Sequence, residues 1–303
     1  MPAAIPPQPI NPPPPEPVDV ADGVRLAVRR WRPTAPDPGG QPWLLVHGLA
    51  SNARLWDGVA ARLAAAGREA VAVDLRLHGQ SADLNRDTEL AVDTPTVADD
   101  LARVLDAFGW DQAAVAGQSW GGNVVIELAR RHPERVAATA GIDGGTIRLA
   151  DRFPEWDDCA AALAPPDFTG RTIGEIEGRM TSMAADWPAE GRAAALANFR
   201  VAEDGQARPW LVLRDHLRVL RGLWEHDPFA AFPHLAMPVL LVGAGSEPAS
   251  DHDRHREAAF DRAVALLPDG RQQWFRPAHH DVHAQHPGLV TESLLDLESA
   301  VGR

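Results

Sequence analysis

The sequence is poor in several residue types, and each scarcity excludes a class of protein. It has one cysteine, Cys159, so a disulfide framework within the chain is excluded, and we expect a reducing compartment such as the cytoplasm. Lysine and tyrosine are absent, and all 29 basic residues are arginine. Together with 42 acidic residues they leave a formal net charge of -13, which argues against nucleic acid or an anionic membrane surface as a partner.

Long apolar runs are absent as well. No run approaches the roughly 20 residues that a membrane-spanning helix needs, so we predict no membrane span. Residues 1–17 are mostly proline and lack the basic and apolar regions of a secretory signal, so we predict a disordered, polyproline-like arm there. The remaining length and a hydrophobic content of 45% suit one large globular unit with a sizeable core.

Strand and helix patterns alternate along most of the chain. An opening hairpin is predicted around Asp22 and Gly23. Helical patterns, for example over residues 55–66 and 94–108, separate short apolar runs. The second of these helices is predicted to have Thr96 as its N-cap. This alternation is typical of a parallel sheet covered by helices on both faces. The apolar runs predicted as strands are residues 43–46, 70–74, 112–116, 136–142 and 238–243.

Residues 146–235 interrupt this rhythm. They read as helical pieces separated by proline and glycine, with no predicted strand. Helices inserted between two strands would lie over the carboxyl edge of the sheet, where open α/β folds bind ligands. We therefore predict a helical cap over residues 146–235, with some of its aromatic side chains facing an apolar substrate.

The strand predicted over residues 112–116 ends in the motif Gly-x-Ser-x-Gly, with Ser119 at its centre, and a helical pattern follows at once. A strand, a sharp turn and a helix with serine at the apex is the arrangement called a nucleophile elbow. Gly117 and Gly121 suit a bend where chain segments pass close together, and a helix N-terminus favours negative charge nearby. The bare motif also occurs in surface turns, so the flanking sequence carries the argument.

Four stretches in order resemble the α/β-hydrolase superfamily over almost everything after Val18. They are the strand ending in His47-Gly48, the turn over residues 74–81 with Leu77 where glycine is usual, the serine motif over residues 117–122, and His280 seven residues before Pro287. The resemblance implies an α/β fold with a mostly parallel sheet flanked by helices and an inserted helical cap. It divides the chain into a core, residues 18–145 and 236–303, and a cap, residues 146–235.

The resemblance also implies roles. Ser119 would be the nucleophile, and it needs a histidine to remove its proton. His279, His280 and His283 compete for that role, and the spacing to Pro287 favours His280. The backbone N–H groups of Leu49 and Trp120 would form the oxyanion hole.

The acid of the triad has two candidates. Most family members place it after the strand over residues 238–243, three residues beyond the glycine, but that position is Ser246 here, with Glu247 beside it and Asp251 further on. A minority place the acid after the preceding strand, where Asp143 stands. An acid that orients a histidine has to sit at a fixed strand end, so Asp143 is the prediction and Glu247 the reserve.

This constellation is typical of a serine hydrolase that cleaves a carboxylic ester or lactone of a small-to-medium apolar substrate without a cofactor. Carbon–carbon bond hydrolysis and perhydrolysis use the same residues. Epoxide hydrolases and dehalogenases of the fold carry aspartate where this chain has Ser119, and epoxide opening relies on tyrosines that this chain lacks. Iminopeptidases share Ser-Trp-Gly but have a different loop after the first histidine, which makes peptide cleavage a weaker alternative.

Two other classes of function stay open on the sequence. Residues 279–286 are rich in histidine and could bind a metal, joined by Asp251, His252 and His255, although catalytic zinc sites usually have tighter spacing. The fold also hosts proteins that bind ligands without turnover. No metal is predicted, and the oligomeric state is open.

Overall fold

The computed structural model describes residues 10–86 and 89–301. Its centre is an eight-stranded sheet of order β1-β2-β4-β3-β5-β6-β9-β10. The first two strands pair antiparallel with each other, and β2 pairs antiparallel with β4, whereas all the remaining pairs are parallel. The strands are β1 (Glu16–Ala21), β2 (Val24–Trp31), β3 (Trp43–Val46), β4 (Ala70–Asp74), β5 (Ala113–Gln118), β6 (Val136–Ile142), β9 (Val239–Ala244) and β10 (Gly270–Phe275).

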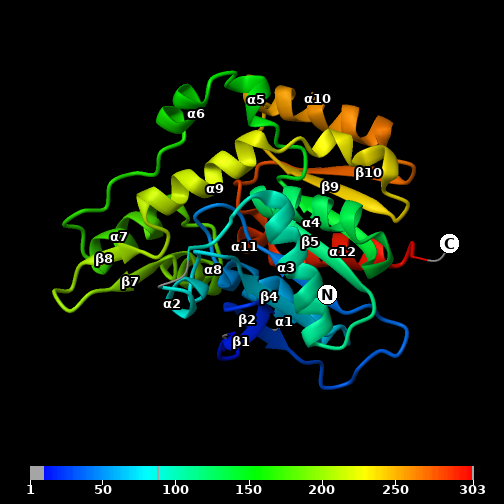
Figure 1. Ribbon diagram of the computed structural model, residues 1–303, viewed down its shortest axis with the longest axis horizontal. Coiled ribbons are helices and arrows are strands. Elements are labelled where there is room, and N and C mark those ends of the chain that lie inside the picture. The colour runs from blue at the N-terminus through cyan, green and yellow to red at the C-terminus, as the bar shows by residue number, and fades with distance from the viewer. Residues whose placement is uncertain (1–9, 87–88, 302–303) are drawn as a thin grey trace, which may run out of the picture.

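Helices cover both faces of this sheet (Figure 1). Side chains alternate across each strand, so Leu44 and Val46 of β3 join a core with α3, α4 and α10, whereas Trp43 and Leu45 pack on the other face with α1 and α12. The helices of the core are α1 (Asp57–Ala65), α2 (Ser81–Leu84), α3 (Thr94–Ala107), α4 (Trp120–Arg131), α10 (Asp251–Leu266), α11 (Val282–Gln285) and α12 (Pro287–Glu298), with short 3-10 helices at Ala53–Trp56, Pro133–Arg135, Pro228–Ala230 and Phe232–His234.

The strand register brings the ends of four strands together. Val46 lies opposite Gly117, Gln118 opposite Ile142, and Ile142 opposite Val242. The residues that follow β3, β5, β6 and β9 therefore meet at one carboxyl edge, which is where open α/β sheets bind their ligands.

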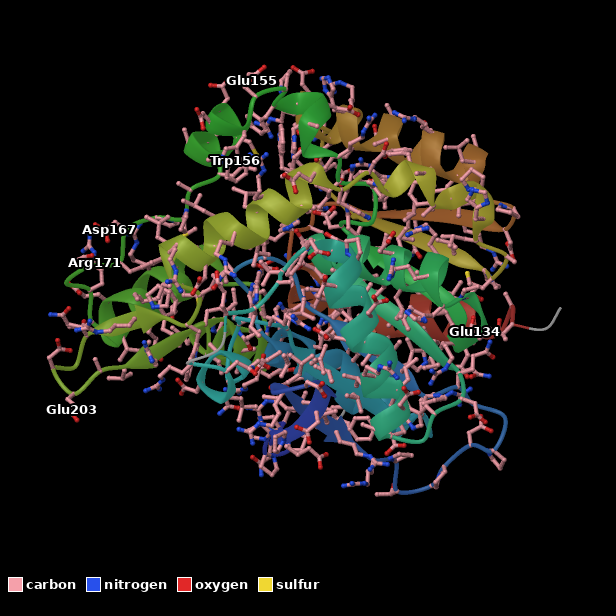
Figure 2. The ribbon with its side chains drawn as sticks, in the orientation of Figure 1. Glu134, Glu155, Trp156, Asp167, Arg171 and Glu203 are labelled. Atoms are coloured by element: carbon pink, nitrogen blue, oxygen red, sulfur yellow. The ribbon has the colours of Figure 1, made fainter. Side chains whose placement is uncertain are left out.

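The segment between β6 and β9, here called the insertion, lies at the left and top of Figure 1. A strand-free insertion was the prediction, and it is wrong, because two short strands form an antiparallel hairpin. The turn of this hairpin contains Asp204 and Gly205, an Asp-Gly pair with Gly205 at φ 76°, as hairpin turns require. Its tip, marked by Glu203 in Figure 2, protrudes at the outer edge of the molecule together with Asp167 and Arg171. The elements are α5 (Leu149–Arg152), α6 (Trp156–Ala162), α7 (Ile173–Met183), α8 (Ala189–Leu196), β7 (Phe199–Val201), β8 (Ala207–Pro209) and α9 (Leu213–Glu225).

The structure differs from two of the predicted boundaries. The arm predicted over residues 1–17 is too long, because β1 begins at Glu16 and Pro17 pairs with Ala27; proline is tolerated there since β1 is an edge strand. Residues 1–9 lie outside the described part of the chain. The N-cap of α3 is Asp93, whose carboxylate accepts a hydrogen bond from the N–H of Thr96.

None of the helices within residues 10–86 and 89–301 has both the length and the apolar composition needed to cross a lipid bilayer.

Candidate active site

Ser119 occupies the bend between β5 and α4. Its backbone has φ 54° and ψ −124°, a conformation that residues with a side chain rarely adopt, and its side chain is partly exposed. The flanking glycines are required by contact, because a Cβ at Gly117 would lie 2.0 Å from the carbonyl oxygen of Gly121. A Cβ at Gly121 would lie 2.4 Å from that of His47. Strained backbone of this kind is typical of functional sites.

The loop after β3 lies against the serine. A Cβ at Gly48 would come within 2.8 Å of the Cβ of Ser119. The buried ring of His47 accepts a hydrogen bond from the N–H of Leu75 at 3.0 Å, so its other nitrogen carries the proton and donates to the carbonyl oxygen of Gly48 at 2.7 Å. Burial lowers the pKa of His47 to about 4, which keeps this ring neutral.

This hydrogen bond orients a backbone donor. In a trans peptide the C=O and N–H point in opposite directions, so turning the Gly48 carbonyl toward His47 turns the Leu49 N–H away from that ring. Trp120 is the first residue of α4, where a backbone N–H has no partner within the helix. Neither N–H donates to any acceptor among residues 10–86 and 89–301. Two free donors therefore flank Ser119, as an oxyanion hole requires.

Asp143 and His280 form a hydrogen-bonded pair. Nδ1 of His280 lies 2.6 Å from Oδ2 of Asp143. Asp143 directly follows β6 and has φ 44°, and only 2% of its side chain is exposed, whereas the side chain of His280 is half exposed. Loss of solvation opposes protonation of His280, but the hydrogen bond and negative charge of Asp143 outweigh it and raise the pKa of the imidazole.

Two contacts hold the segments that carry Ser119, Asp143 and His280 close together. Nε2 of Gln118 donates to the carbonyl oxygen of His280 at 3.2 Å, and a Cβ at Gly144 would lie 2.1 Å from the carbonyl oxygen of Ser119. Within the described part of the chain no hydrogen bond joins Oγ of Ser119 to the ring of His280. Such bonds are often long without substrate and tighten in the complex.

The competing acid lies elsewhere in the structure. Glu247 is exposed and forms no hydrogen bond or ion pair within the described ranges. Ser246, at the more common position of the acid that the family resemblance implies, instead donates its N–H and hydroxyl to Asp253, at 3.1 and 2.6 Å. Asp251 is an exposed partner of Arg254.

Within the described residues, neither competing histidine forms a hydrogen bond or ion pair with Asp143. His283 is fully buried against Trp56, with ring centroids 4.4 Å apart, and His279 is half exposed, 3.8 Å from Asp186. Over the described residues, no three histidine, cysteine or carboxylate side chains gather closely enough to hold a metal ion.

Leu77 has φ 66°, in the left-handed region that glycine adopts without strain. The family pattern that this turn resembles has glycine at this position. The turn over residues 74–81 forms nonetheless, since the carboxylate of Asp74 accepts from the N–H groups of Ala53 and Gln80 at 2.7 and 2.9 Å.

An apolar cavity of about 470 Å³ opens beside His280, under α7 of the insertion. A second cavity, of about 780 Å³, borders His280 from the side of Asp143 and α10. The apolar side chains that line the first cavity include Phe168, Ile176, Met180, Trp187 and Phe199.

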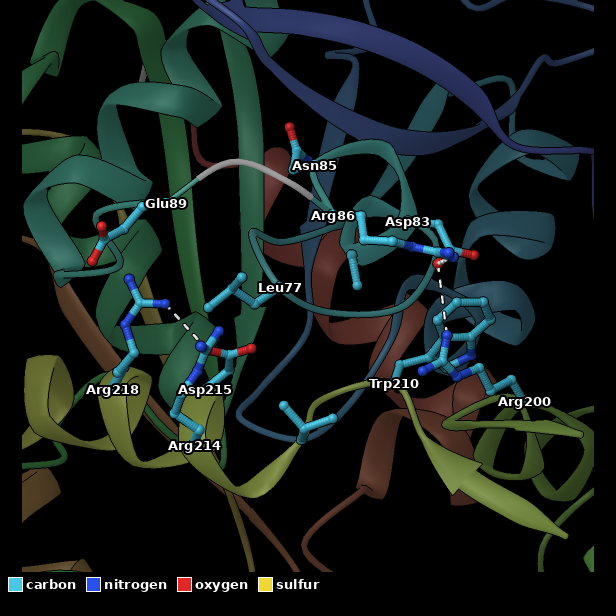
Figure 3. A pocket seen from close by; sticks show the side chains of 12 residues that line it. Leu77, Asp83, Asn85, Arg86, Glu89, Arg200, Trp210, Arg214, Asp215 and Arg218 are labelled. Carbon is cyan, nitrogen blue, oxygen red and sulfur yellow. Dashed lines mark hydrogen bonds and ion pairs between the residues drawn. The ribbon is translucent and has the colours of Figure 1, made fainter. Parts of the chain in front are cut away.

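A third pocket, of about 620 Å³, is polar and contains none of the candidate residues (Figure 3). It contains ion pairs: Nη1 of Arg218 lies 3.1 Å from Oδ1 of Asp215, and Nη1 of Arg200 lies 3.8 Å from Oδ1 of Asp83. Nothing in it suits the chemistry of Ser119.

Known proteins resemble this chain along most of its length. The family model described as alpha/beta hydrolase fold matches residues 41–287. Esterase YbfF of Escherichia coli strain K12 is 28% identical over 267 residues, which cover 84% of this chain and 91% of that protein.

Two further relatives match over shorter stretches. A putative non-heme haloperoxidase of Mycobacterium phage D29 is 34% identical over 132 residues, 42% of either chain. Epoxide hydrolase B of Mycobacterium tuberculosis strain H37Rv is 35% identical over 107 residues, 35% of this chain and 30% of that protein. Both alignments span less than half of these relatives' own length.

Among solved structures, E-2-(acetamidomethylene)succinate hydrolase superposes with a TM-score of 0.75 at 23% identity, covering 94% of this chain and 99% of the other. That likeness shows the shared fold. The chain thus belongs to the alpha/beta hydrolase fold family.

Proposed function

We propose that this protein is a serine hydrolase that cleaves a carboxylic ester or lactone through an acyl-enzyme. Ser119 attacks the carbonyl carbon while His280 takes the hydroxyl proton, and the N–H groups of Leu49 and Trp120 stabilise the oxyanion. Asp143 stabilises the imidazolium that forms. His280 then protonates the leaving alkoxide, and water activated by the same ring releases the acid and restores Ser119.

The hydrogen bond between His280 and Asp143 carries this proposal. It fixes Nδ1 as the protonated nitrogen and leaves Nε2 as the base, which is the tautomer that proton abstraction from a serine needs. The carboxylate is buried and held from its other side, so it can orient the ring without swinging into solvent.

Two observations support an apolar ester substrate. The cavity beside His280 is lined mostly by apolar side chains and has room for a small-to-medium acyl group. The relative aligned over most of both chains is named an esterase.

Carbon–carbon bond hydrolysis and perhydrolysis remain the alternative reactions for the same residues, followed by amide cleavage and by ligand binding without turnover. Epoxide opening is not proposed despite the partial match to epoxide hydrolase B, because that reaction needs a carboxylate where Ser119 stands and the chain has no tyrosine.

The test combines a covalent probe with a substrate series. A fluorophosphonate should label the wild-type protein and leave Ser119→Ala unlabelled. The wild type should hydrolyse p-nitrophenyl esters, with a chain-length optimum set by the apolar cavity, and a panel of lactones separates the two substrate classes. Activity should be equal with and without a metal chelator. An unlabelled wild type, or Ser119→Ala that hydrolyses these esters at the wild-type rate, would reject the proposal.

A further inference from the structure

Arg256, on α10, contacts the carboxylate of Asp143 from the side opposite His280. Its Nη1 donates to Oδ1 of Asp143 at 2.5 Å, and the N–H of Ala244 donates to the same oxygen at 2.9 Å. Oδ2 is left for His280. Each oxygen of a carboxylate buried to 98% thus has its own partners.

Arg256 is itself held in place. Its Nη2 donates to Oδ1 of Asp253 at 2.7 Å and to the carbonyl oxygen of Ala244, and its guanidinium lies 5.5 Å from the centroid of the Trp274 ring. A guanidinium fixed at three points presents its remaining N–H in one direction.

The anchor of Arg256 is equally ordered. Oδ2 of Asp253 accepts from the hydroxyl of Ser246 at 2.6 Å and from the N–H and hydroxyl of Ser250 at 2.9 and 2.7 Å. Burial favours protonation of this carboxyl, but these donors and Arg256 outweigh it and lower the pKa of Asp253. The carboxylate of Asp253 therefore stays ionised and holds Arg256 through its negative charge.

We propose that Arg256 is a positioning residue of the active site, which locks the carboxylate of Asp143 in the orientation that places Oδ2 on Nδ1 of His280. The inference rests on the proposed function for its catalytic consequence. Its structural part, the orientation of Asp143 and His280, is measurable without turnover.

Arg256 also contributes charge to the site. The charged and titratable groups that face His280 are Asp143 at the end of β6, Asp281 before α11, His283 on α11 and Arg256 on α10. Removing Arg256 has two opposite effects on the pKa of His280, because it removes a repelling cation and also releases the carboxylate of Asp143. The hydrogen bond and charge of Asp143 are the larger influences, so the acidic limb of kcat/KM should move to lower pH.

Two substitutions separate orientation from charge. Arg256→Met removes both the paired donors and the cation, so we expect kcat to fall at least tenfold with KM little changed, and the acidic limb of kcat/KM to move to lower pH. Removing an outer hydrogen-bond partner that orients a metal-binding histidine usually costs about 10- to 100-fold in activity, and we expect a loss of the same order for the partner of Asp143. Arg256→Lys retains the repelling cation but not the planar pair of donors, so kcat should fall and the acidic limb should move to lower pH at least as far as in Arg256→Met.

Arg254→Met is the matched control. Arg254 lies two residues away on the same helix, is exposed and pairs with Asp251 rather than with Asp143. This variant should keep the wild-type kcat, KM and pH profile.

A nuclear magnetic resonance titration of the His280 ring provides the readout that does not need a substrate. In Arg256→Met the ring should titrate at lower pH than in the wild type, and the downfield proton resonance on Nδ1 should weaken. Folded Arg256→Met with unchanged kcat and unchanged His280 titration would overturn the inference. If Arg256→Met does not fold, Arg256→Lys with wild-type kcat and Nδ1 resonance would overturn it. A wild type that fails to label at Ser119 rejects the proposed function instead.

Discussion

The side chain of Gln118 donates a hydrogen bond to the carbonyl oxygen of His280, 162 residues further along the chain. Gln118 is the last residue of β5 and immediately precedes Ser119, so this bond ties the loop of the histidine to the strand that presents the serine. The proposed reaction depends on this proximity of His280 to Ser119.

Asp143→Asn should reduce kcat by roughly 10⁴-fold, because the amide stabilises the wrong tautomer of His280 and cannot stabilise its cation. Glu247→Gln should leave kcat unchanged, since Glu247 is exposed and forms no hydrogen bond within the described residues. Steady-state kinetics on one p-nitrophenyl ester compares the two variants directly. The reverse ranking would transfer the role of the acid to Glu247.

The pH profile should follow the titration of His280. Neutral imidazole is the active form, and Asp143 raises the pKa of this ring, so activity should be lost as pH falls through that raised value. Asp143→Asn removes the stabilising charge, and the acidic limb of its residual kcat/KM should therefore move to lower pH. An unmoved limb would mean that Asp143 does not set the proton affinity of His280.

Gly144→Ala should destabilise the protein by about 1–3 kcal/mol or more and lower its activity, because the new Cβ would lie 2.1 Å from the carbonyl oxygen of Ser119. Gly178→Ala is the matched control. Gly178 lies inside α7 with no atom within 4 Å of its would-be Cβ, so this change should stabilise the protein by about 0.5–1 kcal/mol. Denaturant unfolding measures both variants, and equal effects would contradict the contact.

His283→Phe should make stability less dependent on acid. Burial lowers the pKa of His283 to about 3, and neither ring nitrogen has a hydrogen-bond partner among the described residues. In the unfolded chain this histidine is protonated below about pH 6.5, whereas in the folded chain it stays neutral down to about pH 3. The free energy of unfolding therefore falls by roughly 1.4 kcal/mol per pH unit as the pH is lowered from about 6.5 to about 3. Phenylalanine removes this proton uptake and can keep the ring contact with Trp56.

The measurement is the free energy of unfolding at pH 7 and at pH 4.5. His255→Gln, an exposed position on α10, is the control and should keep the wild-type difference between the two values. If the free energy of unfolding of His283→Phe changes between pH 7 and pH 4.5 as much as that of the wild type, His283 is not the source of the acid sensitivity.

Local patterns in the sequence determined most of the fold. Alternating apolar runs and helical periods predict the parallel sheet and its flanking helices, because each strand and helix buries a face that its own residues define. The bend at Ser119 is also local, since Gly117 and Gly121 are the residues that permit it. The sequence pattern does not predict the hairpin of β7 and β8, although its Asp-Gly turn is visible. Strands of three residues are too short to show the alternating pattern that distinguishes a strand from a helix.

Only the tertiary structure decided which distant groups meet. The sequence leaves Asp143 and Glu247 as candidates for the acid and three histidines near the C-terminus as candidates for the base. The hydrogen bond between Asp143 and His280, 137 residues apart, selects one of each. The network that joins Arg256 and Asp253 to this pair has no sequence signature, because its members come from separate strand ends and one helix. Hydrogen bonds of this kind depend on the strand register and on the direction of each side chain, and both are set only when the sheet closes.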